Sequence, residues 1–199
     1  MGDGEDHAAA VRALRAGELV VYPTETVYGL GADALDTDAV RRVFEAKGRD
    51  RSEPVSMAVP DIEAVGEYTR PTERERAFIE AFLPGPVTVV LERKPAVPDV
   101  LTAGADRVGV RIPDHEDARA LLADVAPLTA TSANASGQPA ARRVDDLDEE
   151  IRRAVAVVLD GGETPGGGST VVDVTAKRII RRGARADDVA AWLAQSETG

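Results

Sequence analysis

Lys47 and Arg49, two cations separated by a single glycine, have the types and spacing that most directly suggest chemistry. Only three of the 24 basic residues are lysines, and the chain carries a formal net charge of −11. An ammonium and a planar guanidinium at this spacing can bind a polyphosphate. The pair also follows a predicted helix that stops near Gly48, where cations compensate the helix dipole. This segment alone leaves both interpretations open.

A second polar segment, Pro-Thr-Glu-Thr-Val-Tyr-Gly-Leu-Gly at 23–31, follows directly after a short apolar strand predicted at 19–22. Ligands of open α/β sheets usually bind where strands end, so its hydroxyls, carboxylate and glycines could line a cleft. The alternative is a turn begun by Pro23, with a threonine or glutamate capping a short helix.

Ser132 and Asn134 lie in a polar loop that follows an apolar strand predicted at 128–131. Their small donors and acceptors suit a phosphate or a hydrated metal, although the segment could also be a simple turn. The glycine-rich run 161–170 is not a Walker motif, because it lacks Gly-Lys-Ser/Thr and precedes a strand. No Gly-x-Ser-x-Gly elbow is present, which argues against a serine hydrolase. His7 and His115 are far apart in sequence, so we expect surface histidines and no histidine metal site.

The composition predicts one soluble globular domain, with 43% hydrophobic and 30% charged residues in 199. No apolar run approaches the ~20 residues that span a bilayer. The acidic N-terminus does not resemble a targeting peptide, and cysteine is absent, so we expect a cytoplasmic location. A pI near 4.7 argues against nucleic acid held on a broad basic face. We expect a flexible segment at 1–7 and a single domain at 8–199.

Hydrophobic periodicity indicates alternating helices and strands along the whole chain. One helix is predicted to begin after an N-cap at Asp36 and to end near Gly48. The other helices are predicted at 8–16, 61–68, 72–83, 115–124, 145–153 and 187–194. Strands are predicted at 19–22, 55–59, 87–91, 108–112, 128–131, 155–159, 170–174 and 178–180. Interleaved elements of this kind favour an α/β fold with a sheet of mixed strand directions.

Taken together, the motifs resemble the YrdC-like family of threonylcarbamoyl-AMP synthases over about residues 8–185. The matching order is Pro-Thr-Glu-Thr-Val-Tyr-Gly-Leu-Gly at 23–31, Lys-x-Arg at 47–49, Pro-Gly-Pro-x-Thr at 84–88, Val-x-Val-Arg-Ile-Pro at 108–113, Ser-x-Asn at 132–134, Ser-Thr-Val-Val-Asp at 169–173, and an arginine before Gly183. The resemblance implies a twisted open mixed sheet with flanking helices and a concave cationic cleft.

The resemblance also implies an enzyme, a nucleotidyltransferase that forms threonylcarbamoyl-AMP and pyrophosphate. Its substrates would be L-threonine, bicarbonate or CO2, and ATP, with Mg²⁺ accompanying the ATP. The product would serve threonylcarbamoyladenosine modification of tRNA, through a transient downstream transferase complex. Binding of tRNA by the chain itself is expected to be weak or absent.

By the same resemblance, Lys47, Arg49, Ser132 and Asn134 are expected to be catalytic and to bind ATP, with Arg181 near the nucleotide. Thr24, Arg111 and Ser169 correspond to threonine-binding positions. Arg111 suits a bidentate contact with the amino-acid carboxylate. No protein residue is expected to ligate a metal.

Two departures from the family pattern leave alternatives open. Some members have a histidine after Lys-x-Arg that helps to hold threonine, whereas 54–59 is Pro-Val-Ser-Met-Ala-Val. The usual Arg-Pro-Gly is Arg181-Arg182-Gly183. Because of the missing histidine, a paralogue with another carbamoyl acceptor remains one alternative. An RNA-binding module on the same fold is the other, since the concave cationic face that the resemblance implies could accept a nucleic-acid backbone.

Overall fold

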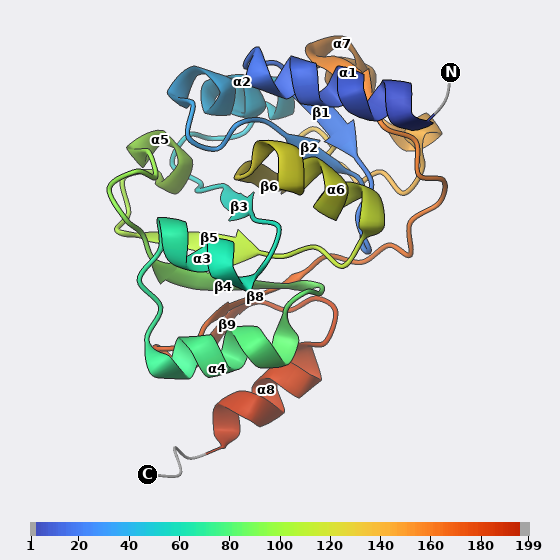
Figure 1. Ribbon diagram of the computed structural model, residues 1–199. Coiled ribbons are helices and arrows are strands. Elements are labelled where there is room, and N and C mark those ends of the chain that lie inside the picture. The colour runs from blue at the N-terminus through green and yellow to red at the C-terminus, as the bar shows by residue number, and fades with distance from the viewer. Residues whose placement is uncertain (1–2, 196–199) are drawn as a thin grey trace.

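The computed structural model describes residues 3–195, which form a twisted mixed sheet with flanking helices (Figure 1). Within this range the sheet has nine strands in the order β7-β1-β2-β6-β3-β5-β4-β8-β9. The strands are β1 (Leu19–Tyr22), β2 (Gly29–Gly31), β3 (Ser56–Ala58), β4 (Val87–Glu92), β5 (Arg107–Arg111), β6 (Leu128–Ser132), β7 (Val155–Val158), β8 (Thr170–Asp173) and β9 (Arg178–Arg181). The pairs β1–β7, β3–β5 and β4–β8 are parallel, and the other neighbours are antiparallel. The predicted α/β class with mixed strand directions is confirmed.

The helices lie on both faces of this sheet. They are α1 (Asp3–Arg15), α2 (Thr37–Lys47), α3 (Ile62–Tyr68), α4 (Glu73–Phe82), α5 (Asp99–Thr102), α6 (Glu116–Val125), α7 (Glu149–Ala154) and α8 (Ala186–Ala194), with a short 3₁₀ helix, η1, at Val144–Asp146. Side chains of β1 alternate between two cores. Val20 and Tyr22 pack with α1 and α6, whereas Leu19 and Val21 pack with α2 and α7. All four are buried, so both faces of β1 are covered.

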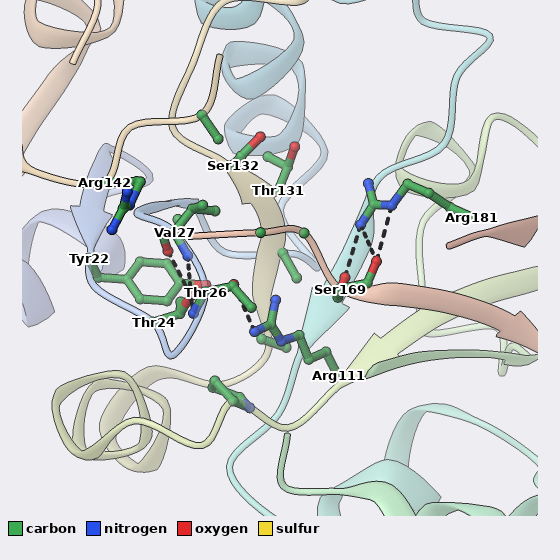
Figure 2. Close-up of a pocket in the computed structure, with 17 residues that line it drawn as sticks. Tyr22, Thr24, Thr26, Val27, Arg111, Thr131, Ser132, Arg142, Ser169 and Arg181 are labelled. Carbon is green, nitrogen blue, oxygen red and sulfur yellow. Dashed lines mark hydrogen bonds between the residues drawn. The ribbon is translucent and has the colours of Figure 1, made fainter. Parts of the chain in front are cut away.

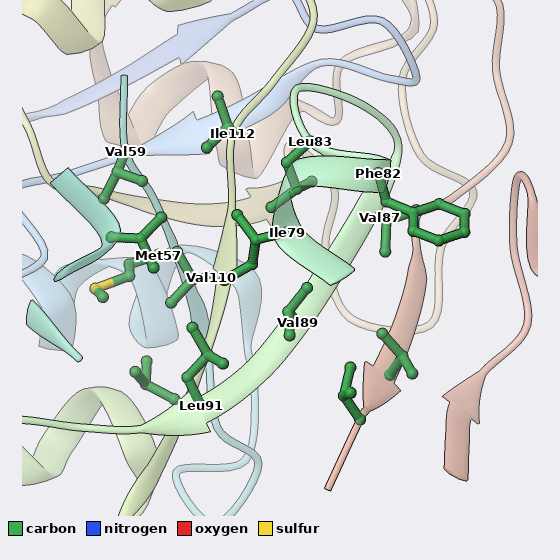
Figure 3. Close-up of a cluster of buried hydrophobic side chains, with 14 of the residues drawn as sticks. Met57, Val59, Ile79, Phe82, Leu83, Val87, Val89, Leu91, Val110 and Ile112 are labelled. Carbon is green, nitrogen blue, oxygen red and sulfur yellow. The ribbon is translucent and has the colours of Figure 1, made fainter. Parts of the chain in front are cut away.

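The largest core lies at the other end of the sheet, where α3, α4 and α8 pack on β3, β4, β5 and β8. Figure 3 shows the aliphatic side chains of β4 and β5 facing those of α4. Phe78 stacks on Phe82 and meets the Trp192 ring edge-on, with a centroid separation of 4.9 Å. This core anchors the strands that carry Arg111 and Ser169.

Helix α2 follows the prediction closely. Its N-cap Asp36 accepts hydrogen bonds from the backbone N–H groups of Asp38 and Ala39, and Gly48 ends it in the left-handed conformation with φ of 55°. Val40, Val43 and Phe44 are buried, as their spacing predicts. The helix therefore ends with Lys47 buried against the sheet.

Several boundaries differ from the prediction. Helix α1 begins at Asp3, so residues 3–7, expected to be flexible, are helical, while residues 1 and 2 lie outside the described range. His7, expected to be solvated, lies with Nε2 2.8 Å from Asp124 Oδ2 of α6. The predicted helix at 145–153 divides into η1 and α7. Strand β2 and helix α5 were not predicted, because three or four residues are too few to establish a period.

Between residues 3 and 195, no helix has the length and apolar character needed to cross a membrane.

Candidate active site

A cavity of about 370 Å³ opens where the ends of several strands meet (Figure 2). Its walls come from β1, β2, β3, β5, β6 and β9, from the 23–28 loop and from the glycine-rich run that ends at Ser169. Five of the eight predicted site residues line it: Thr24, Arg111, Ser132, Ser169 and Arg181. The predicted cleft at a strand end is present, because pairing in the sheet brings together segments that are far apart in sequence.

Arg111, the last residue of β5, is held on one side of the cavity. Its Nη2 donates to Thr26 Oγ1 at 3.0 Å and lies 2.8 Å from Glu25 Oε1. Thr24 Oγ1 donates to the Val27 carbonyl at 2.7 Å and lies 3.0 Å from Thr26 Oγ1, which fixes the loop as a turn. The 23–28 segment is therefore a turn, but it caps no short helix as the alternative interpretation expected, and it also lines the cavity.

Arg181, at the end of β9, is held through Ser169. Its Nη2 donates to Ser169 Oγ at 2.9 Å and to the Ser169 carbonyl at 3.0 Å. Ser169 Oγ also lies 3.1 Å from Thr88 Oγ1 of β4. Partial burial, together with the charges of Arg111 and Arg49, lowers the pKa of Arg181. The Arg181 guanidinium is therefore close enough to those of Arg111 and Arg49 to be repelled by each, an arrangement that an anion would stabilise.

Lys47 does not line this cavity, although its charge was expected to bind phosphate there. Its Nζ donates to the backbone carbonyls of Ser132 at 2.5 Å and Asn134 at 2.7 Å. The side chain is buried, and burial, with a contribution from Arg49, lowers its pKa to about 8. Lys47 thus fastens the end of α2 to the loop that carries Ser132. Two of its three N–H donors are used in these contacts.

Arg49 and Asn134 also lie outside the cavity wall. Arg49 donates to the carbonyls of Glu53 and Pro54 at 3.2 Å each, so it braces the loop after α2. Asn134 Nδ2 donates to the carbonyls of Ala135 and Gln138 at 2.8 Å each. Its Oδ1 is buried and has no hydrogen-bond partner within the described structure. The Asn134 side chain therefore keeps one buried acceptor without a partner in the described structure.

The glycines of the 23–31 segment have two different roles. A Cβ at Gly31 would lie 2.9 Å from Tyr22 Cε1, and one at Gly29 would lie 3.0 Å from Tyr22 Cζ. Both glycines therefore leave room for the Tyr22 ring, whose hydroxyl donates to the Thr129 carbonyl at 3.3 Å. Only Gly29 of the two also lines the cavity.

Sequence reasoning missed several residues of the cavity wall, among them Tyr22, Thr26, Arg142, Gly167 and Gly168. Thr26 lies in the 23–31 segment, whose hydroxyls were expected to be able to line a cleft, although Thr26 was not singled out. The two glycines lie in the 161–170 run, for which only a Walker motif was considered and excluded. Arg142 lies ten residues beyond Ser132 and has no motif of its own. It donates to the Thr164 carbonyl at 3.1 Å and pairs with Glu163 at 2.9 Å. Only the folded chain places it here.

The lining side chains provide three guanidinium groups and several hydroxyls, but no carboxylate. Such a wall suits anionic groups, which arginine binds through two parallel hydrogen bonds. Across residues 3–195, no group of three or more His, Asp or Glu side chains is arranged to hold a metal ion. The stretch 54–59, which lacks the histidine of some relatives, contributes Ala58 to the wall.

The chain is similar to known proteins in sequence and in fold. A Pyrococcus abyssi threonylcarbamoyl-AMP synthase is 42% identical over 165 residues, which cover 81% of this chain and 48% of that protein. A putative threonylcarbamoyl-AMP synthase from Mycobacterium leprae is 42% identical over 181 residues, 88% of this chain and 82% of the relative. The crystal structure of P. abyssi Sua5 complexed with L-threonine superposes with a TM-score of 0.87 at 38% identity, covering 95% of this chain and 58% of that one.

The chain thus spans about half the length of the archaeal relative and most of the mycobacterial one. Residues 12–183, which contain every predicted site residue, match the Sua5-YciO-YrdC family, described as telomere recombination. The chain therefore belongs to the Sua5-YciO-YrdC family.

Proposed function

We propose that the chain is a threonylcarbamoyl-AMP synthase. It joins L-threonine, bicarbonate or CO2, and ATP into threonylcarbamoyl-AMP and pyrophosphate. The observation that carries this proposal is the shared cavity, because Thr24, Arg111, Ser132, Ser169 and Arg181 converge there from separate parts of the chain. Support also comes from relatives that bear this name and from the related Sua5 that was crystallised with L-threonine.

The reaction makes demands that this cavity can meet. The amine nitrogen of threonine attacks the carbon of CO2, one C=O π bond opens onto its oxygen, and the amine loses a proton to solvent, which gives a carbamate. From bicarbonate, the same C–N bond forms while a C–O bond breaks and the oxygen leaves as water. A carbamate oxygen then bonds to the α-phosphorus of ATP, while the bond to pyrophosphate breaks and its electron pair leaves with pyrophosphate. Negative charge gathers on the leaving group, and preorganised cations stabilise such a transition state. Arg181 and Arg111 are the proposed cations, with Arg111 binding the carboxylate of threonine.

The remaining assignments follow from their positions. Ser132 and Ser169 supply hydroxyl groups at the cavity wall, and Thr24 shapes the turn beside Arg111. Lys47, Arg49 and Asn134 are assigned to the support of the ATP-binding wall. Mg²⁺ enters with ATP, on its phosphate oxygens. The product passes to the transferase complex that modifies tRNA. The net charge of −11 weighs against the RNA-binding alternative.

The test is release of pyrophosphate from ATP and Mg²⁺. We expect release only when both L-threonine and bicarbonate are present, and formation of threonylcarbamoyl-AMP in equal amount by mass spectrometry. Release that does not depend on threonine would contradict the proposal, as would the absence of any release. Replacing threonine with another amino acid distinguishes this enzyme from a paralogue with a different carbamoyl acceptor.

A further inference from the structure

Glu25 is the acidic residue of the 23–31 segment, and the proposed reaction gives it no role. It lies between Thr24 and Thr26, which both line the cavity, but it is not itself part of the lining. Its Oε1 lies 2.8 Å from Arg111 Nη2, and the two side chains are only 16% and 12% exposed. The guanidinium that faces the cavity is thus backed by a largely buried carboxylate.

The carboxylate of Glu25 has few other partners. Both of its oxygens are buried, and neither accepts a hydrogen bond within the described structure. The ion pair with Arg111 is therefore the polar contact of this carboxylate within the described structure. The charge of Glu25 also acts on Tyr22, a residue of the cavity wall. Burial is the main cause that raises the pKa of Tyr22 to about 12, while Arg111 lowers this pKa and Glu25 raises it.

The ligand that we propose for this cavity is not a simple anion. An amino acid carries an ammonium group next to its carboxylate. The lining has three arginines and no acidic side chain, so these residues alone would attract the carboxylate and repel the ammonium. A negative charge directly behind Arg111 reduces the repulsion of the ammonium at this end of the cavity and weakens the binding of ligands that carry only negative charge.

We propose that Glu25 is a specificity-determining residue, whose charge makes the Arg111 end of the cavity prefer a zwitterionic amino acid to a plain carboxylate. This inference rests on the proposed function and extends it, since it says how threonine is selected without the histidine of some relatives. Glu25 acts through its charge and through Arg111, and no proton transfer is assigned to it.

The experiment compares two ligands by isothermal titration calorimetry. L-Threonine and 3-hydroxybutanoate share the carboxylate and the hydroxyl, and only threonine has the ammonium group. We expect the wild-type protein to bind threonine more tightly. In Glu25→Gln, which keeps the shape and removes the charge, we expect threonine to weaken and 3-hydroxybutanoate to tighten, so that the ratio of their Kd values changes by about tenfold. Glu25→Asp, which retains the charge, should keep most of the preference.

Glu75→Gln is the matched control. Glu75 is also a buried acid paired with an arginine, with Oε1 3.0 Å from Arg107 Nη2, but neither residue lines the cavity. This variant should lose stability and keep the wild-type ratio. A purely structural role for Glu25 predicts that Glu25→Gln weakens both ligands equally, and that result would overturn the inference. Equal wild-type affinity for the two ligands would also overturn it, even if Glu25→Gln failed to fold.

Pyrophosphate release by the wild-type protein separates this inference from the proposed function. Threonine-dependent release together with an unchanged ratio in Glu25→Gln contradicts the role of Glu25 alone. An absence of threonine-dependent release contradicts the proposed function, and the inference falls with it.

Discussion

The two ends of the candidate site use their cations in different ways. At one end Lys47 is buried, and its ammonium donates to the carbonyls of Ser132 and Asn134. At the other end Arg111 and Arg181 line the cavity and are held by side chains, Thr26 and Glu25 for one and Ser169 for the other. All three residues were predicted from the sequence to bind the substrates. In the structure Lys47 supports the wall, whereas Arg111 and Arg181 face the cavity. Stability and activity should therefore respond differently to their removal.

The largest combined effect is expected for Lys47→Met, which keeps the length of the side chain and removes its donors. Two carbonyls lose their partner, while relief from burying the charge offsets part of the cost, so the free energy of unfolding should fall on the order of 2 kcal/mol at pH 7. Displacement of the Ser132 loop should also lower kcat by about 10²-fold. Chemical denaturation and pyrophosphate release measure the two effects. A fully stable but inactive variant would show that Lys47 acts on the ligand alone.

In contrast to Lys47→Met, Arg181→Ala should lower activity strongly and change stability little. Arg181 is only partly buried and its hydrogen bonds are to Ser169, so the free energy of unfolding should change by less than about 1 kcal/mol. Loss of a cation that stabilises the leaving pyrophosphate should lower kcat/KM for ATP by about 10²-fold. The same two assays decide the outcome. If Arg181→Ala were destabilised more than Lys47→Met, the division between supporting and ligand-facing cations would be wrong.

The pH dependence of stability reports on the buried ammonium of Lys47. The pKa of Lys47 falls to about 8 in the folded protein from a usual value of 10.5. Between these values the unfolded chain holds more protons than the folded one, so this group makes stability rise as pH increases. The neutral amine can still donate to both carbonyls. The gain should reach on the order of 2 kcal/mol by about pH 9.5.

Denaturation of wild type and Lys47→Met, compared from pH 7 to 9.5, tests this. Subtracting the two curves removes the effect of the overall negative charge, and the difference should grow with pH. A difference that stays constant over this range would mean that the charge of Lys47 is not disfavoured by burial. The window stops before Tyr22 and Tyr28, whose pKa values burial raises to about 12, begin to lower stability above about pH 10.

Local signals in the sequence predicted the scaffold better than they predicted the roles of side chains. The caps of α2 at Asp36 and Gly48 were read correctly, because capping depends on residues a few positions apart. The cleft after β1 was also expected, since strand ends collect ligand-binding loops. The contacts of Lys47 could not be predicted, because its flexible side chain meets a loop 85 residues away. Arg142 reaches the wall only through folding of the 133–143 loop against the glycine-rich run.

The 23–31 segment also contains a residue that supports the wall without lining the cavity, and adding a single methyl group to it tests this role. Gly31 packs against Tyr22 without lining the cavity, and an added Cβ would lie 2.9 Å from the ring, closer than side chains tolerate. Gly31→Ala should therefore lower the free energy of unfolding by about 1–3 kcal/mol, as expected for overpacking of a core. Because Gly31 is a supporting residue, the KM for threonine should change much less than the stability.

Gly66→Ala provides the matched control for this smallest change. Gly66 lies within α3, and an added Cβ there would meet nothing within 4 Å. Alanine is a better helix former than glycine by about 0.5–1 kcal/mol, so this variant should be slightly more stable than the wild type. Thermal unfolding of the two variants gives the comparison. If Gly31→Ala instead raised KM while leaving stability unchanged, Gly31 would belong to the ligand-facing wall together with Tyr22, which lines the cavity.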